Sequence, residues 1–239
     1  MIVTIHQPEH LPWLGFFDKA SQADVLVLLD DVQFRKNYFQ NRNRILSANG
    51  PVWLTVPVFS KGKGDQLINE VRINNDGNPL WGEKCWKSMS QCLGKASFFP
   101  DHREFFNSLY QTRWELLGDL NATVIRYLVS ALGIDAELVS ASELAVTGER
   151  SERLVNICAK LGATTYLSGV SGKEYLDLAM FGRKGIEVRF QEFYHPIYKQ
   201  LYNPFVACLS VVDLLFNYGP DSLNVIGGIG VEKMNQVFL

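Results

Sequence analysis

The sequence lacks any long, uninterrupted apolar run. None of its 239 residues belongs to a stretch that approaches the roughly 18 consecutive apolar residues of a membrane-spanning helix, so we expect no membrane span. The opening MIVTIHQPEH has neither a basic leader nor a long apolar core, which argues against a secretory signal. The four cysteines show no C-x-x-C spacing of the kind found in zinc sites. These absences predict a cytoplasmic protein with reduced thiols.

The chain also has little excess charge of either sign. Its 23 Lys and Arg residues stand against 25 Asp and Glu residues, for a net charge of −2. Proteins that bind nucleic acid usually present a basic field, so we expect no nucleic-acid partner. The G-x-S-x-G turn of serine hydrolases is absent, and no cysteine lies beside a histidine or a basic cluster in the sequence. Covalent catalysis is therefore not supported.

The opening segment has the pattern of a strand, a helix and a second strand. Residues 2–6 predict a strand, residues 11–21 a short amphipathic helix, and residues 25–29 a buried strand. In an open parallel sheet, ligands bind at the carboxyl ends of the strands. The residues that follow these two strands are therefore candidate site residues: His6, Gln7, Asp30 and Asp31.

The rest of the chain predicts one α/β fold with a helical middle. An Asn49-Gly50 turn predicts a hairpin, residues 67–73 a short strand, and residues 81–132 two or three helices. The last third alternates, with strands predicted at 136–142, 164–169 and 186–193 and helices at 149–162, 173–185 and 205–216. This alternation is typical of a Rossmann-like, mostly parallel sheet flanked by helices. We expect a core domain of residues 1–75 and 134–239 and a helical insertion of residues 76–133.

The loop SGVSGKEY joins a predicted strand to a predicted helix. Glycines allow backbone N–H groups to approach an anion, and a helix N-terminus carries partial positive charge. The residues that would form such a phosphate cradle are Ser168, Gly169, Ser171, Gly172 and Lys173. The spacing is not that of a P-loop, and a serine-capped helix entry without a ligand explains the same residues.

The polar residues at the strand ends allow several roles. His6 suits a general base or a phosphate contact, and equally a hydrogen-bonded histidine that stabilises the turn. Asp30 and Asp31 follow an aliphatic run, so at least one carboxylate emerges at the strand end. Either suits a turn or cap, an anchor for a substrate amine or ribose, or a Mg²⁺ ligand, and Asp31 is the candidate metal ligand.

A basic and amide-rich cluster follows the second strand. Arginine binds phosphate or carboxylate with two parallel hydrogen bonds, and nearby Tyr38 and Phe39 suit stacking on a base. The candidate ligand-binding residues are Arg35, Lys36, Asn41, Arg42, Asn43 and Arg44. A solvated basic loop is the alternative. The near-neutral net charge favours a single nucleotide-type ligand over a polymer.

The chain resembles the WbqC-like protein family. The resemblance rests on IHQPEHLPWLGFFDK, on DDVQF with KN and QNRNRI, on WLTVPV, on YLSGVSGKEYLD with GIEV, and on HPIYKQ through SVVDLLFN with its following glycine. These blocks run from residue 2 to about residue 219, outside the divergent helical middle. The resemblance implies a role in bacterial surface-polysaccharide (O-antigen) biosynthesis, with nucleotide-linked amino sugars as the theme.

The layout of the opening segment is also similar to that of nucleotidylyltransferases and pantothenate-synthetase-like ligases, which bind ATP. Pro12-Trp13-Leu14-Gly15 stands where that group carries H-x-G-H, so the two histidines of that motif are absent and the similarity is one of layout alone. The leading hypothesis is an enzyme that forms an amide on a nucleotide-linked amino sugar by aminoacyl or acyl transfer, with ATP and Mg²⁺ as cofactors. The alternatives are a nucleotidyl or glycosyl transferase acting on a nucleotide sugar, and a non-catalytic nucleotide-sugar-binding protein.

Overall fold

A five-stranded parallel sheet lies at the centre of the computed structural model, which describes residues 1–62, 64–77 and 80–234. The strand order is β5-β2-β1-β6-β7. The bounds are β1 Ile2–His6, β2 Val25–Leu28, β5 Glu137–Ser140, β6 Thr165–Ser168 and β7 Glu187–Phe190. The chain builds outward from β1 in one direction and then returns to its other side with β6, so the strand order reverses between β1 and β6. The α/β, Rossmann-like prediction is confirmed.

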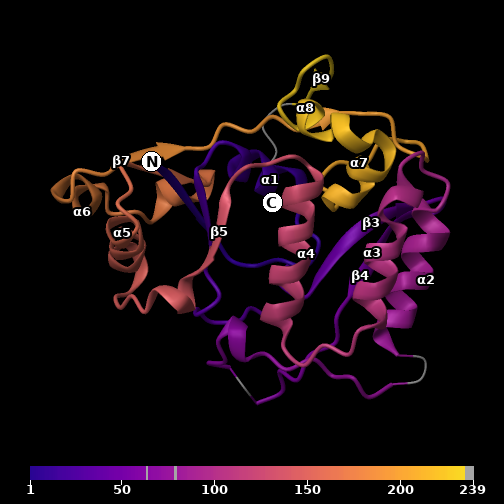
Figure 1. The fold of residues 1–239 in the computed structure, drawn as a ribbon, viewed down its shortest axis with the longest axis horizontal. Coiled ribbons are helices and arrows are strands. Elements are labelled where there is room, and N and C mark those ends of the chain that lie inside the picture. The colour runs from indigo at the N-terminus through magenta and orange to yellow at the C-terminus, as the bar shows by residue number, and fades with distance from the viewer. Residues whose placement is uncertain (63, 78–79, 235–239) are drawn as a thin grey trace.

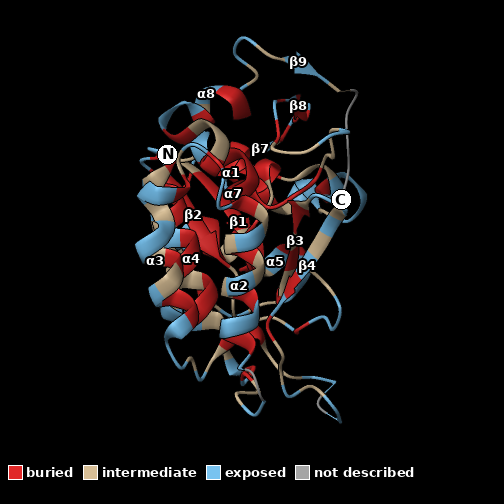
Figure 2. Cartoon of the chain, turned by 90° about the vertical axis from the view of Figure 1, so that its right-hand side faces the viewer, coloured by how far each residue is buried: buried red, intermediate tan, exposed pale blue. Residues whose placement is uncertain are grey.

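The two faces of the sheet are covered by different helices because side chains alternate along a strand. Val3 and Ile5 of β1 pack in one buried cluster with α5 (Arg150–Lys160) and α6 (Leu178–Arg183). Leu26 and Leu28 of β2 belong to the other cluster, with α1 (Leu14–Ser21), α4 (Leu117–Ala131) and α7 (Val211–Tyr218). Figure 1 shows α5 and α6 at one end of the molecule. In Figure 2 the central strands are largely buried and the outer helices are exposed on one side.

The predicted hairpin is present as β3 (Arg42–Ser47) and β4 (Gly50–Thr55). Ser47 pairs with Gly50, and the Ser47 hydroxyl donates to the Gly50 carbonyl at 2.7 Å. Gly50 has a φ of 103°, a backbone conformation that favours glycine at this turn. A second two-stranded pair, β8 (Pro196–Ile197) with β9 (Glu232–Lys233), lies near the C-terminus.

The helical middle consists of α2 (Trp81–Leu93), α3 (Phe99–Gln111) and α4. The helix α3 begins at Phe99, and Pro100 lies in its first turn, where proline is tolerated. Buried side chains of these helices share one core cluster with β2, α1 and α7. The predicted division of the chain into a core and an insertion stays a prediction.

Several predicted elements are wrong in type or extent. The segment 67–73, predicted as a strand, contains a 3-10 helix at Ile68–Glu70, because Ile68 and Val71 are buried at a spacing of three, and it forms only isolated β-bridges at Leu67, Arg72 and Ile73. The predicted helix at 173–185 divides into a 3-10 helix at Val170–Glu174 and α6, because the Asp177 side chain caps a new helix by accepting from the Ala179 and Met180 amides. Residue 63 and residues 78–79, which follow the hairpin, lie outside the described residues; the sequence SKGKGDQ around residue 63 predicts a flexible loop and NNDGNP around residues 78–79 predicts a turn.

Boundaries at both ends of the chain also differ from the prediction. The first helix begins at Leu14 rather than at Leu11, because Leu11 has a φ of 51° and does not continue a helix. The last predicted helix is displaced to α7, and a further short helix, α8 (Ser222–Ile226), follows it. Across residues 1–62, 64–77 and 80–234, none of the helices combines the length and apolar character of a membrane crossing.

We expect Leu26→Ala to lower the free energy of unfolding by about 2–5 kcal/mol, because Leu26 is fully buried in the centre of the sheet. Urea denaturation followed by far-UV circular dichroism measures the change. Leu178→Ala is the matched control, because Leu178 is 52% exposed, and it should change stability by less than about 0.5 kcal/mol. Equal losses for the two variants would contradict this account of the core.

Candidate functional site

A cavity of about 1060 Å³ opens at the carboxyl ends of β1 and β6. This is the point where the strand order reverses, the position at which open α/β sheets bind ligands. Thr4 of β1 is paired with Leu167 of β6, and the Thr4 hydroxyl donates to the Leu167 carbonyl at 2.8 Å. The pairing brings His6 and Gln7 to one side of the opening and Ser168 and Gly169 to the other.

Three ionisable side chains from β1, its following loop and α1 line the inner part of this cavity: His6, Glu9 and Lys19. The Lys19 ammonium donates to the Ile5 carbonyl at 3.2 Å. Burial lowers the pKa of Lys19 to about 8, although Glu9 opposes that shift. Burial raises the pKa of Glu9 to about 8, and Lys19 opposes that shift. The two groups are therefore electrostatically coupled inside one cavity.

The His6 imidazole is neutral at physiological pH. Burial lowers its pKa to about 3, and the positive charge of Lys19 contributes in the same direction. Its Nδ1 lies 3.0 Å from the Gln7 carbonyl, which can only accept, so Nδ1 carries the proton and Nε2 is the acceptor. The ring meets Phe16 edge-on, with centroids 4.8 Å apart. His6 is thus held in one tautomer and one orientation.

Gln7 links the end of β1 to the segment that carries Arg35. The Gln40 side-chain amide donates to the Gln7 side-chain oxygen at 2.7 Å, and the Gln40 side-chain oxygen accepts from the Arg35 amide at 2.7 Å. The Asn121 amide of α4 donates to the carbonyls of Gln40 at 2.8 Å and Pro8 at 3.2 Å. A buried network with these partners orders both loops at the cavity wall.

The rim of the cavity is cationic and partly aromatic. Arg35, Arg150 and Arg153 line it, and the Arg35 guanidinium lies 4.8 Å from the Tyr38 ring centroid. Phe39, Trp13, Tyr166, Tyr175 and Phe193 supply further aromatic walls. Lys19 adds a further basic group to the lining, against the acidic residues Glu9 and Glu174, and burial raises the pKa of Glu9. The balance of charge favours an anionic ligand.

The loop after β6 contributes to the cavity only in part. Ser168, Gly169 and Ser171 line it, as the sequence suggested. Gly172 does not, because it packs closely on Ser168: an added Cβ would meet the Ser168 hydroxyl oxygen at 2.1 Å. Lys173 is exposed, with its ammonium 5.5 Å from the Phe190 ring centroid. The loop leads into a 3-10 helix, so the predicted α-helix N-terminus is absent there.

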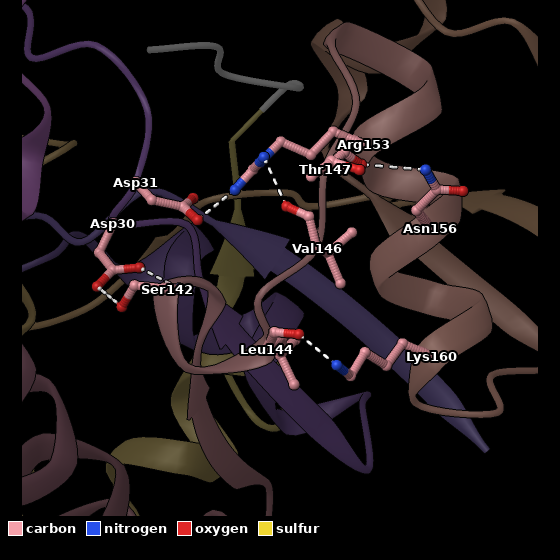
Figure 3. Close-up of polar contacts among 9 residues, drawn as sticks. All are labelled: Asp30, Asp31, Ser142, Leu144, Val146, Thr147, Arg153, Asn156 and Lys160. Carbon is pink, nitrogen blue, oxygen red and sulfur yellow. Dashed lines mark hydrogen bonds and ion pairs between the residues drawn. The ribbon is translucent and has the colours of Figure 1, made fainter.

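The two adjacent carboxylates point to different protein partners, and neither lines the cavity (Figure 3). Asp30 accepts from the Ser142 amide at 3.0 Å and from the Ser142 hydroxyl at 2.6 Å. Asp31 forms an ion pair with Arg153. Burial raises the pKa of Asp31, and the Arg153 charge opposes that shift. In the described part of the chain, no three His, Cys, Asp or Glu side chains gather as a metal site would need.

Arg153 also holds the segment that precedes α5. It donates to the Val146 carbonyl at 2.9 Å, while Asn156 donates to the Thr147 carbonyl at 3.0 Å and Lys160 donates to the Leu144 carbonyl (Figure 3). Three side chains on one helix thereby hold the segment between β5 and α5 against that helix. The same guanidinium lines the cavity, so the ion pair with Asp31 sets its position at the rim.

Most of the basic cluster has a structural role instead of lining the cavity. Asn41 donates to the Val56 carbonyl at 2.8 Å, and Asn43 donates to the Leu11 carbonyl at 2.7 Å. Arg42 and Arg44 lie over Trp53 of the hairpin, at 4.4 and 5.5 Å from its ring centroid. Lys36 is exposed and outside the cavity lining. Arg35 is the member of the cluster that reaches the cavity.

Sequence reasoning missed the lining residues Glu9, Lys19, Arg150, Arg153 and Glu174. One signal was available for Lys19, because it follows the apolar run LGFF in a short helix that packs on the sheet. No such signal marks Arg150 or Arg153, which begin an ordinary amphipathic helix. Their position at the cavity depends on where α5 packs against the sheet.

Comparisons with known proteins agree over nearly the whole chain. The model of the WbqC-like protein family matches residues 7–225. The chain is also similar to the uncharacterized protein Rv1507c of Mycobacterium tuberculosis, with 33% identity over 222 residues that cover 92% of this chain and 95% of that protein. No solved structure gives a significant match. The family match contains every cavity-lining residue except Ile5 and His6.

We expect the low pKa of His6 to make stability fall in acid. The folded imidazole stays neutral down to about pH 3, whereas the unfolded one binds a proton near its usual pKa of 6.5. Between these values the unfolded state binds more protons, so the free energy of unfolding falls as the pH falls. Between pH 7 and pH 5, the free energy of unfolding of His6→Gln should fall by about 2 kcal/mol less than that of the unaltered protein. Urea titrations at the two pH values measure this, and parallel losses would contradict the shifted pKa.

Proposed function

The chain belongs to the WbqC-like protein family, and from this premise we propose that it acts in bacterial surface-polysaccharide biosynthesis, as an enzyme that forms an amide on a nucleotide-linked amino sugar. The observation that carries the proposal is the cavity at the switch point of the sheet, with its cationic rim and aromatic walls. Its volume of about 1060 Å³ suits a ligand of nucleotide-sugar size.

Different lining residues suit the diphosphate and the base of such a ligand. Arginine side chains bind phosphate with two parallel hydrogen bonds, so Arg35, Arg150 and Arg153 suit the diphosphate. The Ser171 hydroxyl belongs to the same lining and adds a neutral donor, whereas the Ser168 hydroxyl already donates to the Gly169 carbonyl at 3.0 Å. Tyr38 and Phe39 offer ring faces for a base, beside the arginine that would hold the phosphate next to it.

The proposed step is attack of the sugar amine on an activated acyl carbon. A C–N bond forms, the amine proton passes to Nε2 of His6, and the bond from the acyl carbon to its leaving group breaks. His6 can accept that proton because its Nδ1–H is already committed to the Gln7 carbonyl. Phosphates bound nearby would raise its pKa toward the range of an effective base. Orientation in the cavity and the positive rim supply the rest of the rate.

ATP is the proposed source of acyl activation, and the cationic rim fits its phosphates as well as those of a nucleotide sugar. Mg²⁺ enters the proposal as the counter-ion of ATP. Asp31 fits a metal ligand poorly, because Arg153 already pairs with its carboxylate and Asp31 does not line the cavity. Arg35, Arg150 and Arg153 would hold the phosphates of ATP, which would supply the activation of the acyl group when bound.

Binding without catalysis is the second candidate function, and the low pKa of His6 favours it, since a strongly depressed pKa makes a weak base. A protein of this kind would hold a nucleotide sugar as a scaffold or sensor. The two candidates share the cavity and its ligand and differ in whether a product forms.

One experiment separates the candidates. The purified protein is incubated with a UDP-amino sugar, a mixture of carboxylic acids and amino acids, and ATP with Mg²⁺, and the products are analysed by mass spectrometry. We expect a new amide of the nucleotide sugar, lost in His6→Ala although calorimetry shows that the variant still binds the nucleotide sugar. Binding with no product from the unaltered protein would favour the sensor, and release of UMP or UDP would indicate nucleotidyl or glycosyl transfer instead.

We expect Arg35→Gln to weaken binding of a UDP-sugar by about tenfold, because a charge-assisted hydrogen bond to phosphate is lost. Lys36→Gln is the matched control. It removes one positive charge from the adjacent residue, which lies outside the cavity lining, and should change the affinity less than twofold, an order-of-magnitude expectation for a screened surface charge. Isothermal titration calorimetry measures both. Equal weakening would mean that general charge, and not Arg35 itself, attracts the ligand.

A further inference from the structure

Glu9 and Lys19 are two ionisable side chains buried in the same cavity. Glu9 is 6% exposed and Lys19 is 3% exposed. Side chains of these types are rarely buried so far unless they are paired. The burial of both residues in the lining of one cavity is therefore unusual, and a partner that stabilises both is expected.

The protein itself does not supply enough partners. Among the residues that the structure describes, the Oε2 atom of Glu9 has no hydrogen-bond partner. The Lys19 ammonium has three N–H groups and makes one hydrogen bond, to the Ile5 carbonyl. Within the described ranges the two residues form no ion pair with each other. A buried charge with unmet hydrogen-bonding capacity destabilises a folded protein, and such an arrangement is typical of a functional site.

A ligand group that satisfies both residues must donate to Glu9 and accept from Lys19. Phosphate offers acceptors alone, and the Glu9 carboxyl would not favour it in its ionised state. The three arginines at the rim already provide for phosphate. An amino group donates to a carboxylate, and the oxygen of a neighbouring hydroxyl accepts from an ammonium.

We propose that Glu9 and Lys19 form the subsite that recognises the amino group of the sugar together with an adjacent hydroxyl. The proposal rests on the proposed function, because it places the sugar in the same cavity. It also names the amino group as the part of the sugar by which the protein selects its substrate. The amino group binds Glu9 and the hydroxyl binds Lys19. Both residues lie in the lining that also contains His6, which accepts the proton of the reacting amine.

Calorimetry with two matched ligands tests this subsite. UDP-glucosamine and UDP-glucose differ in whether the sugar carries an amine or a hydroxyl at one position. We expect the protein to bind UDP-glucosamine about tenfold more tightly than UDP-glucose, because UDP-glucose lacks one charge-assisted hydrogen bond to Glu9. Glu9→Gln should bind the two ligands equally. Glu174→Gln removes another carboxylate of the same cavity and should keep the tenfold ratio.

The outcomes separate the subsite from the proposed function. If both ligands bind with the same affinity, or if Glu9→Gln keeps the preference, the subsite is wrong while the nucleotide-sugar cavity stands. If neither ligand binds, the proposed function fails, and a second measurement judges the pair without any ligand.

That second measurement is the thermal stability of the double variant Glu9→Gln, Lys19→Met. Residues retained for a ligand should not be needed for folding, so the double variant should melt at the same temperature as the unaltered protein or higher. Each single variant leaves one buried group uncompensated and should melt lower. A double variant that melts several degrees below the unaltered protein would show a structural pair and would overturn the subsite.

Discussion

The pairing of β1 with β2 on one side and β6 on the other is the constraint on which the rest of the structure depends. It places the first strand of the chain at the centre of a parallel sheet and reverses the strand order next to it. A reversal separates the loops that leave the two neighbouring strands, and the cavity lies where they part. His6 and Ser168, far apart in the sequence, meet across that opening because both strands run in the same direction and end at the same edge.

The environment of the cavity explains why its ionisable groups behave differently from those on the surface. Burial disfavours the charged forms of His6, Glu9 and Lys19. It lowers the pKa of His6 and Lys19 and raises the pKa of Glu9. Arg35, Arg150 and Arg153 line the same cavity and are less buried, so the lining combines deeply buried ionisable groups with more accessible cationic ones. Such a combination suits a ligand with an anionic part near the solvent and a polar, uncharged or weakly charged part inside.

The loops around the cavity are ordered by side chains that never reach it. Gln40 and Asn121 tie the segment after β1 to the segment that carries Arg35. Asp31, which seemed a metal ligand from its place in the sequence, instead positions Arg153. Asn41 and Asn43 are bound to main-chain carbonyls in the same way. Polar residues near a site therefore divide into those that face the ligand and those that hold the walls, and hydrogen-bond geometry distinguishes the two groups.

The sequence by itself determined the parallel α/β architecture, the hairpin, the helical middle and the edge of the sheet where a ligand would bind, because strands and helices leave local periodicities and turns need particular residues. It also indicated His6, Gln7, Arg35, Ser168, Gly169 and Ser171, which do line the cavity. Only the tertiary structure decided that Lys173, Arg42 and Arg44 turn away from it and that Glu9, Lys19, Arg150 and Arg153 face it. The reason is physical: the direction of a side chain depends on which distant element packs beside it, and a local pattern of residue types carries no information about that neighbour.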